Sequence, residues 1–355
     1  MSEGTQKKPK IRVGILGATG SVGQRFISLL SSHPWFEIAA LTASERSAGK
    51  AYGQTVRWLQ ASSLPSRIAS LPVQRSEPPV DCPLVFSALD AAVAGPVEEA
   101  FARAGCLVVS NTKSHRYDKD VPLLVPEVNP DHLALARTQK YGGAILTNPN
   151  CSTIGLVLAL KPLAEAFGVD AVSVVTMQAL SGAGFPGVSS FEIVDNLIPY
   201  IDGEEEKIEK ETRKILGKLD GAGIVDAEIA MSAQCNRVAV LDGHTECVSV
   251  KLTRKPSLAD VRAAWEGFSS APQKLRLPSA PLAPIHYLDA ADAPQPRLHR
   301  DLDGGMAASI GRLRPCSLMD FKFVVLSHNT IRGAAGGAIL AAELAVAEGF
   351  LKGHP

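Results

Sequence analysis

The stretch that decides the fold is Ile11-Arg12-Val13-Gly14-Ile15-Leu16-Gly17-Ala18-Thr19-Gly20-Ser21-Val22-Gly23. A β-type apolar run over residues 10–16 leads into a glycine turn, and residues 22–30 then show the apolar spacing of a helix. This order lets backbone N–H groups approach a pyrophosphate at the helix N-terminus. The spacing G-x-x-G-x-x-G differs from the commoner dinucleotide fingerprint, and tight turns also need glycine, so the motif needs support from the rest of the chain.

The chain up to residue 147 continues in the same alternating pattern. Apolar strand-like runs cover residues 36–42, 84–89, 107–110 and 144–146, and helical stretches cover about residues 95–104 and 131–138. Alternating strands and helices are typical of an α/β fold with a doubly wound parallel sheet. We therefore predict a Rossmann-like domain over residues 1–147.

After residue 147 the pattern changes. Longer β-type runs cover residues 169–178, 224–233, 245–253, 309–315 and 321–327. With an amphipathic helix at 204–216 and a Pro/Ala-rich loop at 278–296, they predict an α+β catalytic and dimerisation domain at 148–328 with a mostly antiparallel sheet. Residues 331–351 approach membrane-span length, but Arg332, Glu343 and Glu348 interrupt them. We expect this C-terminal helix to return to the first domain, which residues 329–355 then complete.

Composition narrows the class of partner. The 355-residue chain is 46% hydrophobic, and its 36 Lys and Arg balance its 36 Asp and Glu. Such a chain has no net field to attract nucleic acid or an anionic membrane, so we expect a small-molecule substrate. Its six cysteines form no Cys-x-x-Cys pair, and residues 1–10 are a polar tail without an apolar signal segment. We therefore expect free thiols, no metal site and a cytoplasmic location.

One thiol stands apart, in Asn148-Pro149-Asn150-Cys151-Ser152-Thr153. Cys151 lies between a turn and the apolar run 154–160, which predicts a helix beginning at the thiol. Partial positive charge at a helix N-terminus favours thiolate, so we expect a lowered pKa and a nucleophile. The remaining cysteines lie in or beside apolar or strand-like runs and are expected to be small buried hydrophobes: Cys82, Cys106, Cys235, Cys247 and Cys316.

Two later regions offer partners for this thiol. Gln178 and Ser181-Gly182-Ala183-Gly184 end a β-type run, where backbone could line a nicotinamide or an acyl oxygen. Arg237 and His244 flank a turn, so a hairpin could bring them to one site. Arginine would grip a carboxylate in bidentate fashion, and histidine would move a proton near neutral pH. Taken singly, each of these residues is more often structural.

The end of the second strand bears on the choice of cofactor. NAD enzymes usually present an acidic residue there. Here Ser44 and Ser47 lie beside Arg46 and Lys50, a set that suits a 2′-phosphate. The acidic Glu45 would also be compatible with NAD as the cofactor, but the pattern as a whole favours NADP.

Together these motifs closely resemble the aspartate-semialdehyde dehydrogenase family, in particular its archaeal and fungal branch. The resemblance covers about residues 11–351. It is carried by Gly17-Ala-Thr-Gly20, Asn150-Cys151-Ser-Thr, Gln178 with Ser181-Gly-Ala-Gly, Arg237 seven residues before Gly243-His244, the loop 110–130, and Asn329-Thr-Ile-Arg-Gly-Ala-Ala-Gly336. Two positions depart from the family pattern. Ala239 stands where proline is common, and His328 stands where an acidic or amide residue is usual.

The resemblance implies an NADP-dependent, phosphorylating aldehyde oxidoreductase that acts through a cysteine thioester. Cys151 would be the nucleophile, His244 the general acid/base, and Gln178 would orient the acyl group. On the substrate side Arg237 would hold the α-carboxylate, Glu204 the amine and Lys207 the carboxylate or phosphate, although Glu204 and Lys207 also belong to an ordinary charge run. Asn111, Lys113 and Arg116 would hold phosphate.

The cofactor-binding set implied in this way comprises Gly17, Ala18, Thr19, Gly20, Ser21, Val22, Ser44, Arg46, Ser47, Ser87, Ala88, Leu89, Ser181, Gly182 and Asn329. The family resemblance further implies a homodimer or homotetramer.

Two alternatives stay open at the level of sequence. A relative with the same thiol chemistry, such as a malonyl-CoA reductase or an N-acetyl-glutamyl-phosphate reductase, would differ in its substrate-side residues. A cofactor-binding sensor that has lost catalysis would share only the fold. Retention of Cys151, Gln178, Arg237 and His244 together speaks against the sensor.

Overall fold

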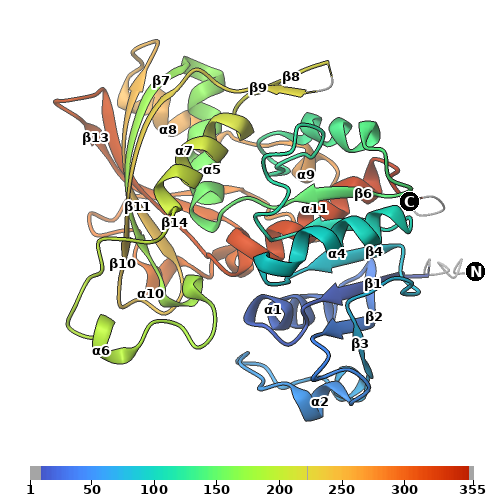
Figure 1. Ribbon diagram of the computed structural model, residues 1–355. Helices are drawn as coiled ribbons and strands as arrows, with labels where there is room; N and C mark the ends of the chain where they lie inside the picture. Colours follow the sequence, from blue (N-terminus) through green and yellow to red (C-terminus); the bar gives the residue numbers. More distant parts are fainter. Residues whose placement is uncertain (1–8, 222, 352–355) are drawn as a thin grey trace, which may run out of the picture.

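The computed structural model describes residues 9–221 and 223–351, and the first eight residues of the predicted polar tail lie outside this range, as do residues 352–355. Two six-stranded sheets lie side by side with helices between and around them (Figure 1). Within the described residues, no helix is long and apolar enough to cross a membrane.

The first sheet is entirely parallel, as predicted, with the strand order β3-β2-β1-β4-β5-β6. Its strands are β1 (Ile11–Leu16), β2 (Phe36–Ala43), β3 (Val73–Arg75), β4 (Leu84–Ser87), β5 (Leu107–Ser110) and β6 (Ala144–Thr147). Its accompanying helices are α1 (Ser21–Leu30), α2 (Tyr52–Thr55), α3 (Ser66–Ala69), α4 (Ala91–Arg103) and the 3₁₀ helix η1 (Pro130–Thr138). The order reverses between β1 and β4, where open α/β sheets bind ligands. The short β3 was not predicted.

The second sheet is mixed and mostly antiparallel, with the order β10-β7-β11-β14-β13-β12. Its strands are β7 (Val169–Gln178), β10 (Ala230–Arg237), β11 (His244–Leu252), β12 (Ile285–Leu288), β13 (Ala308–Pro315) and β14 (Phe321–Ser327). The helices of this half are α5 (Cys151–Phe167), α6 (Ser190–Ile193), α7 (Glu204–Ile215), α8 (Leu258–Glu266), α9 (Ala271–Lys274) and α10 (Pro296–His299). The 3₁₀ turns η2 (Leu180–Ala183) and η3 (Leu302–Gly305) complete it. Helices α5, α7 and α8 lie along one face of the sheet (Figure 1).

Two predictions for this half were wrong. The run 224–233 is not one strand, because its start forms the small hairpin β8 (Lys218–Asp220) and β9 (Gly223–Val225), and β10 begins only at Ala230. The region 278–296 is not all loop, because Ile285–Leu288 pairs with β13 in parallel. β10 and β12 are set by pairing partners distant in the sequence, β7 and β13, whereas β8 and β9 pair with each other locally.

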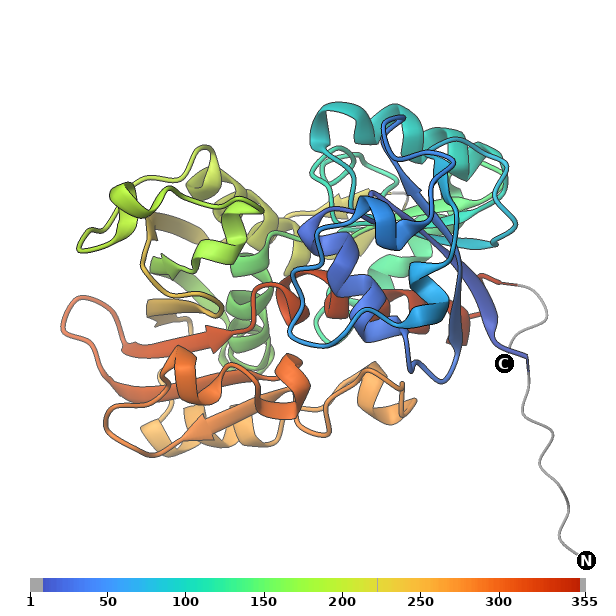
Figure 2. The same ribbon diagram turned by 90° about the horizontal axis from the view of Figure 1, so that it is seen from below.

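The C-terminal segment returns to the first sheet, as predicted. A π-helical turn η4 (Ile331–Ala335) is followed by α11 (Gly336–Ala347), which is buried on all sides in the core formed by β1, β2 and α1. Figures 1 and 2 agree in placing this segment against the first sheet. The buried Glu343 of α11 binds His33 Nε2 at 2.6 Å, just beyond α1.

The expected burial of the cysteines was correct for three of them and wrong for two. Cys82, Cys106 and Cys235 are buried, whereas Cys247 is exposed and Cys316 is half-buried. Cys247 points to the face of β11 that α5 does not cover, since its neighbours Glu246 and Val248 are buried. All six thiols are free.

Candidate active site

Three predicted site residues meet at one edge of the second sheet. β10 and β7 are parallel and end at the paired residues Arg237 and Gln178. β11 runs antiparallel to β7 and begins there with His244. The topology therefore brings together three side chains that are up to 66 positions apart in the sequence (244 − 178 = 66).

Cys151 completes this group, because α5 begins with it. The Cys151 Sγ lies 3.1 Å from Nε2 of His244. Asn150 is the N-cap residue, and its side-chain oxygen accepts the N–H groups of Ser152 at 2.9 Å and Thr153 at 3.3 Å. Sequence reasoning did not assign Asn150 this role, although asparagine before a predicted helix is a strong N-cap signal.

The predicted lowering of the Cys151 pKa was wrong. Burial raises the pKa of Cys151 to about 12, and the negative charge of Glu204 adds to this, against the opposite effects of Arg237 and Arg116. A backbone hydrogen bond at Cys151 also lowers its pKa, but the effect of burial is larger. Burial thus raises the pKa of Cys151 in the direction that favours the thiol over the thiolate.

Burial acts on the imidazole beside this thiol in the same sense, against its charged form. His244 is fully buried, and burial lowers the pKa of His244 to about 3, with further lowering by the charge of Arg237 and then by His328. Its Nδ1 accepts the backbone N–H of Ala179 at 3.0 Å. Burial therefore disfavours the charged form of each of these two hydrogen-bonded groups, lowering the pKa of His244 and raising the pKa of Cys151.

Arg237 and Gln178 are held by the same sheet edge. Arg237 Nη1 donates to the carbonyl of Ala179 at 2.7 Å, and Gln178 Nε2 donates to Thr176 Oγ1 at 3.3 Å. Gly182 lies against Arg237 and His244, since a Cβ there would be 2.9 Å from Arg237 Nη1 and 3.1 Å from His244 Cε1. The 181–184 segment therefore covers the site with backbone.

Helix α7 places Glu204 at the site rather than on a solvated face. Asn150 Nδ2 donates to Glu204 Oε1 at 2.6 Å, and Lys207 Nζ lies 3.1 Å from Glu204 Oε2. Glu204, Ile208, Glu211 and Ile215 are buried at helical spacing. This period was visible in the sequence, but Glu211 was not among the predicted site residues.

Glu211 connects the predicted phosphate loop to the same place. Its Oε1 accepts Arg116 Nη1 at 2.8 Å, and its Oε2 accepts the backbone N–H of Asn150 at 2.6 Å. Asn111 Oδ1 accepts Asn148 Nδ2 at 2.9 Å. Arg116 is thus buried and already paired, while Lys113 is exposed.

The glycine turn after β1 has the backbone that an anion cradle needs. Gly17 has φ +76°, and a Cβ there would lie 2.5 Å from the carbonyl oxygen of Ala88, at the β1/β4 switch point. The α1 N-cap residue, Gly20, has no side-chain cap. Exposed Ser44 and Arg46, with half-buried Ser47, follow β2 as predicted for a 2′-phosphate. These residues fit a dinucleotide phosphate.

A cavity of about 330 Å³ lies between the start of α1 and the segments that precede and follow the catalytic strands, and the side chains of Cys151 and His244 do not line it. Ser21 and Val22 of α1 line it from one side, and Ser181, Asp242 and Thr330 from the other. Asn329 holds this second wall together, because its Oδ1 accepts the N–H of Gly243 at 2.8 Å and its Nδ2 donates to Ser181 Oγ at 2.8 Å. Ser21, Val22 and Ser181 belong to the predicted cofactor set.

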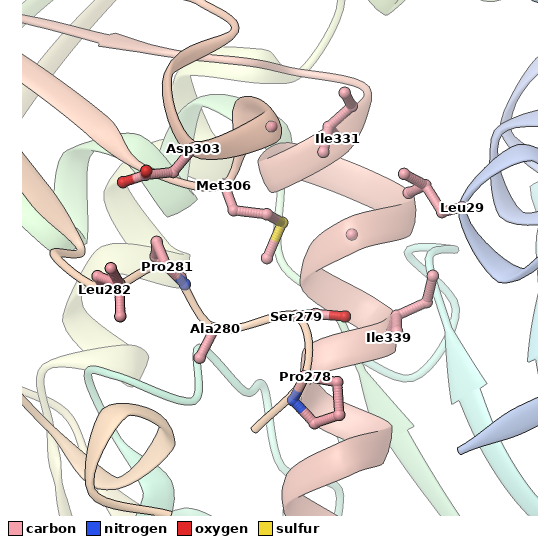
Figure 3. Close-up of a pocket in the computed structure, with 12 residues that line it drawn as sticks. Leu29, Pro278, Ser279, Ala280, Pro281, Leu282, Asp303, Met306, Ile331 and Ile339 are labelled. Atoms are coloured by element: carbon pink, nitrogen blue, oxygen red, sulfur yellow. The ribbon is translucent and has the colours of Figure 1, made fainter. Parts of the chain in front are cut away.

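A second cavity, of about 380 Å³, lies elsewhere (Figure 3). Leu29, Met306, Ile331 and Ile339 give it an apolar lining, and the turn 278–282 closes one side. None of the predicted site residues lines it. It is separate from the group around Cys151.

The chain is similar to known proteins over nearly its whole length. Two family models match, "Semialdehyde dehydrogenase, NAD binding domain" over residues 12–136 and "Semialdehyde dehydrogenase, dimerisation domain" over residues 160–332. The aspartate-semialdehyde dehydrogenase of Candida albicans is 52% identical over 96% of this chain and 99% of its own. That of Archaeoglobus fulgidus is 49% identical over 95% of this chain and 98% of its own. A crystal structure of the Candida albicans enzyme with NADP has a TM-score of 0.89 at 49% identity, covering 97% of this chain and 100% of that one.

Proposed function

The chain belongs to the aspartate-semialdehyde dehydrogenase family, and from this premise we propose how its own residues perform the reaction. It is an NADP-dependent, phosphorylating aldehyde oxidoreductase. It catalyses the reversible reductive dephosphorylation of L-4-aspartyl phosphate to L-aspartate 4-semialdehyde, in the biosynthesis of lysine, methionine, threonine and isoleucine. The similarity supports this activity and not the malonyl-CoA or N-acetyl-glutamyl-phosphate alternatives.

We propose Cys151 as the nucleophile. Its sulfur would attack the acyl carbon of aspartyl phosphate and expel phosphate, leaving a thioester on the enzyme. NADPH, when bound, supplies the hydride that reduces this thioester. The observation that carries the proposal is the 3.1 Å contact of Cys151 Sγ with His244 Nε2 at the sheet edge that also presents Arg237 and Gln178.

The substrate-side roles follow from charge and position. Arg237 would fork the α-carboxylate, and its contact with the Ala179 carbonyl supports this by fixing the guanidinium. Glu204, held by Asn150, would receive the amine, with Lys207 beside it. Gln178, at the end of β7, would orient the acyl group.

For the phosphate we propose the loop that carries Asn111, Lys113 and Arg116. Exposed Lys113 can reach an anion directly. Arg116 already forms an ion pair with Glu211, so it would contribute less to phosphate binding than an unpaired guanidinium. The Asn148–Asn111 bond ties the loop to the turn that precedes Cys151.

The cofactor set given above, from Gly17 to Asn329, is proposed to bind NADP across the cavity between the two sheets. The uncapped α1 terminus would receive the pyrophosphate, and Ser44, Arg46 and Ser47 the 2′-phosphate. We propose a nucleotide-binding domain of residues 1–147, completed by 329–355, and a catalytic and dimerisation domain of residues 148–328.

The protein forms homo-oligomers. We propose a homodimer, or a tetramer built from dimers, that uses the sheet face opposite α5. This proposal is supported by Cys247, which is exposed on β11 although β11 is an inner strand of its sheet. We also propose a cytoplasmic location, supported by the six free thiols.

The test is NADPH formation from aspartate semialdehyde with and without inorganic phosphate. We expect rapid phosphate-dependent reduction of NADP⁺, because phosphate must release the acyl group from Cys151. Equal rates without phosphate, or a requirement for coenzyme A, would contradict the assignment.

A further inference from the structure

One carboxylate of α7 connects the phosphate loop to the turn that carries Cys151. Glu211 is fully buried, and each of its two oxygens has a partner of its own. Oε1 accepts Nη1 of Arg116 at 2.8 Å, and Oε2 accepts the backbone N–H of Asn150 at 2.6 Å. These partners come from the loop after β5 and from the residue before α5, so three separate elements meet at this side chain.

The surroundings of Arg116 keep it in this position. Lys214, further along α7, donates to the carbonyl oxygens of Arg116 at 2.7 Å and Asp118 at 3.0 Å, which fixes the backbone of the loop. The Arg116 side chain is itself buried, and its Nη2 donates to the carbonyl of Asn111 at 3.1 Å. Among the described residues, Glu211 is the one acidic side chain that forms an ion pair with Arg116. The charge of Arg116 is therefore balanced by Glu211.

A buried carboxylate beside Arg116 has two opposite effects on phosphate binding. It holds the guanidinium in place, because an arginine without a partner is costly to bury. It also opposes the phosphate, because two anions beside the same cation repel each other. In the biosynthetic direction phosphate is a product, so it has to leave the site after Cys151 has displaced it. A buried guanidinium without a carboxylate partner would retain the phosphate dianion more tightly.

We propose that Glu211 is a positioning residue that also limits the affinity for phosphate. Its carboxylate is the counter-ion of Arg116 while phosphate is absent, and its second oxygen holds the Asn150 N–H, so the phosphate loop stays aligned with Cys151. When phosphate binds, it shares Arg116 with Glu211 and is released readily. This deepens the proposed function and rests on it, because it takes the loop with Arg116 to be the phosphate site.

The first test separates the charge of Glu211 from its geometry by steady-state kinetics in the oxidative direction. Glu211→Gln removes the charge, and its single acceptor oxygen can serve Arg116 or Asn150 but not both. We expect it to lower the KM for inorganic phosphate at least about fivefold, because the repulsion between the two anions is gone. It should also lower kcat about tenfold, because the loop and the Cys151 turn are no longer held together.

Glu211→Asp makes the opposite change, since it keeps the charge but is too short to reach both partners. It should lower kcat to a similar extent and leave the KM for phosphate within about twofold of the wild type. A KM for phosphate in Glu211→Gln that equals or exceeds the wild-type value would overturn the proposal. So would an equally lowered KM in Glu211→Asp, because the charge would then not be the cause.

Glu209 on the same helix provides the matched control. Its Oε1 accepts a single backbone N–H, that of Ala233, at 3.0 Å. The amide oxygen of Glu209→Gln can keep this bond, so both kinetic constants should stay near those of the wild type.

The second test does not depend on activity. Thermal unfolding of the wild type and of Glu211→Gln, each with saturating NADP⁺, is measured in inorganic phosphate and in sodium chloride of the same ionic strength. Without phosphate, Glu211→Gln should unfold at a lower temperature than the wild type. It should gain more from phosphate, because a more tightly bound ligand stabilises more at the same concentration. An equal gain in the two proteins would overturn the proposal, whereas wild-type NADPH formation that does not depend on phosphate would refute the proposed function itself.

Discussion

Helices α1 and α5 both begin at the site, but their first turns are built in opposite ways. α1 follows a glycine turn, and its N-cap residue, Gly20, has no side-chain cap. At α5, the Asn150 side chain accepts two of the first N–H groups. We therefore propose that the first terminus keeps its donors for a ligand anion, while the second uses two of its donors for the Asn150 cap. A helix N-terminus is therefore an anion site only when the chain leaves it uncapped.

The largest expected effect removes the one reactive group at α5. Cys151→Ala should lower turnover by about 10⁴-fold or more, because no thioester can form. The affinity for NADPH should stay unchanged, since the dinucleotide is assigned to the α1 terminus. Assays of NADPH formation measure the turnover, and a fluorescence titration with NADPH measures the affinity. Weaker binding of NADPH by the Cys151→Ala variant would show that the two helix termini are not separate in function.

At α1 the matched pair Gly23→Ala and Gly20→Ala tests the glycine turn. A Cβ at residue 23 would lie 2.4 Å from the Gly17 carbonyl and 2.8 Å from Ala18 Cα, whereas one at residue 20 has its nearest neighbour at 3.5 Å. We expect Gly23→Ala to cost about 1–3 kcal/mol in unfolding free energy, as overpacking does, and to weaken NADPH binding. Gly20→Ala should cost less than about 1 kcal/mol. Urea denaturation of both variants measures these unfolding free energies. Similar midpoints for the two variants would argue against the close approach of Gly23 to Gly17 and Ala18.

At α5 the corresponding change is Asn150→Ala, with Asn150→Ser as its control. Alanine removes the cap and the bond to Glu204, and should cost about 1–2 kcal/mol. Serine can still cap the helix but cannot reach Glu204, so it should recover most of the stability and not the affinity for the substrate amine. Thermal unfolding and the KM for aspartate semialdehyde separate the two roles. If both variants unfold alike, the cap is not what stabilises α5.

The effect that depends on pH concerns a buried carboxyl group of the second sheet. Glu246, on β11, is buried, and among the described residues its carboxyl oxygens have no hydrogen-bond partner. Burial raises the pKa of Glu246 well above its ordinary value of 4.5. The folded state therefore holds this proton after the unfolded state has released it, so stability falls as pH rises above the unfolded pKa, by about 1.4 kcal/mol per pH unit until the folded pKa is reached.

Glu246→Gln cannot ionise in either state, so this loss disappears. The variant should match the wild type near pH 4 and become more stable than it toward pH 7, as chemical denaturation at each pH would show. A constant difference across this range would mean that Glu246 is not protonated in the folded protein.

Local sequence was sufficient where an element carries its own pattern. The turn from Gly17 to Gly23, the helix at 204–215 and the strands 169–178 and 321–327 were predicted nearly to the residue, because glycine spacing and apolar period determine them locally. Strand β12 was missed, since Ile285–Leu288 lies among prolines and becomes a strand only by pairing with β13.

The residues of the site could likewise be predicted where the local sequence carries the signal. Residue types identified Cys151, Arg237 and His244, and the structure brings them together with Gln178. The pKa of Cys151 could not be predicted, because it depends on burial and on Glu204, which reaches the thiol from another helix. The exposure of Cys247 was likewise hidden, because a strand's period does not say which face the helices cover.

The return of α11 has a consequence for synthesis on the ribosome. The apolar core of the first sheet contains residues from β1 and β2 and also Ala338, Leu340 and Leu344, which emerge almost 300 residues after β2 (338 − 43 = 295). The usual order, in which N-terminal domains fold first during translation, is therefore closed to this chain. Its first-made sheet therefore lacks part of its apolar cover until α11 has been synthesised.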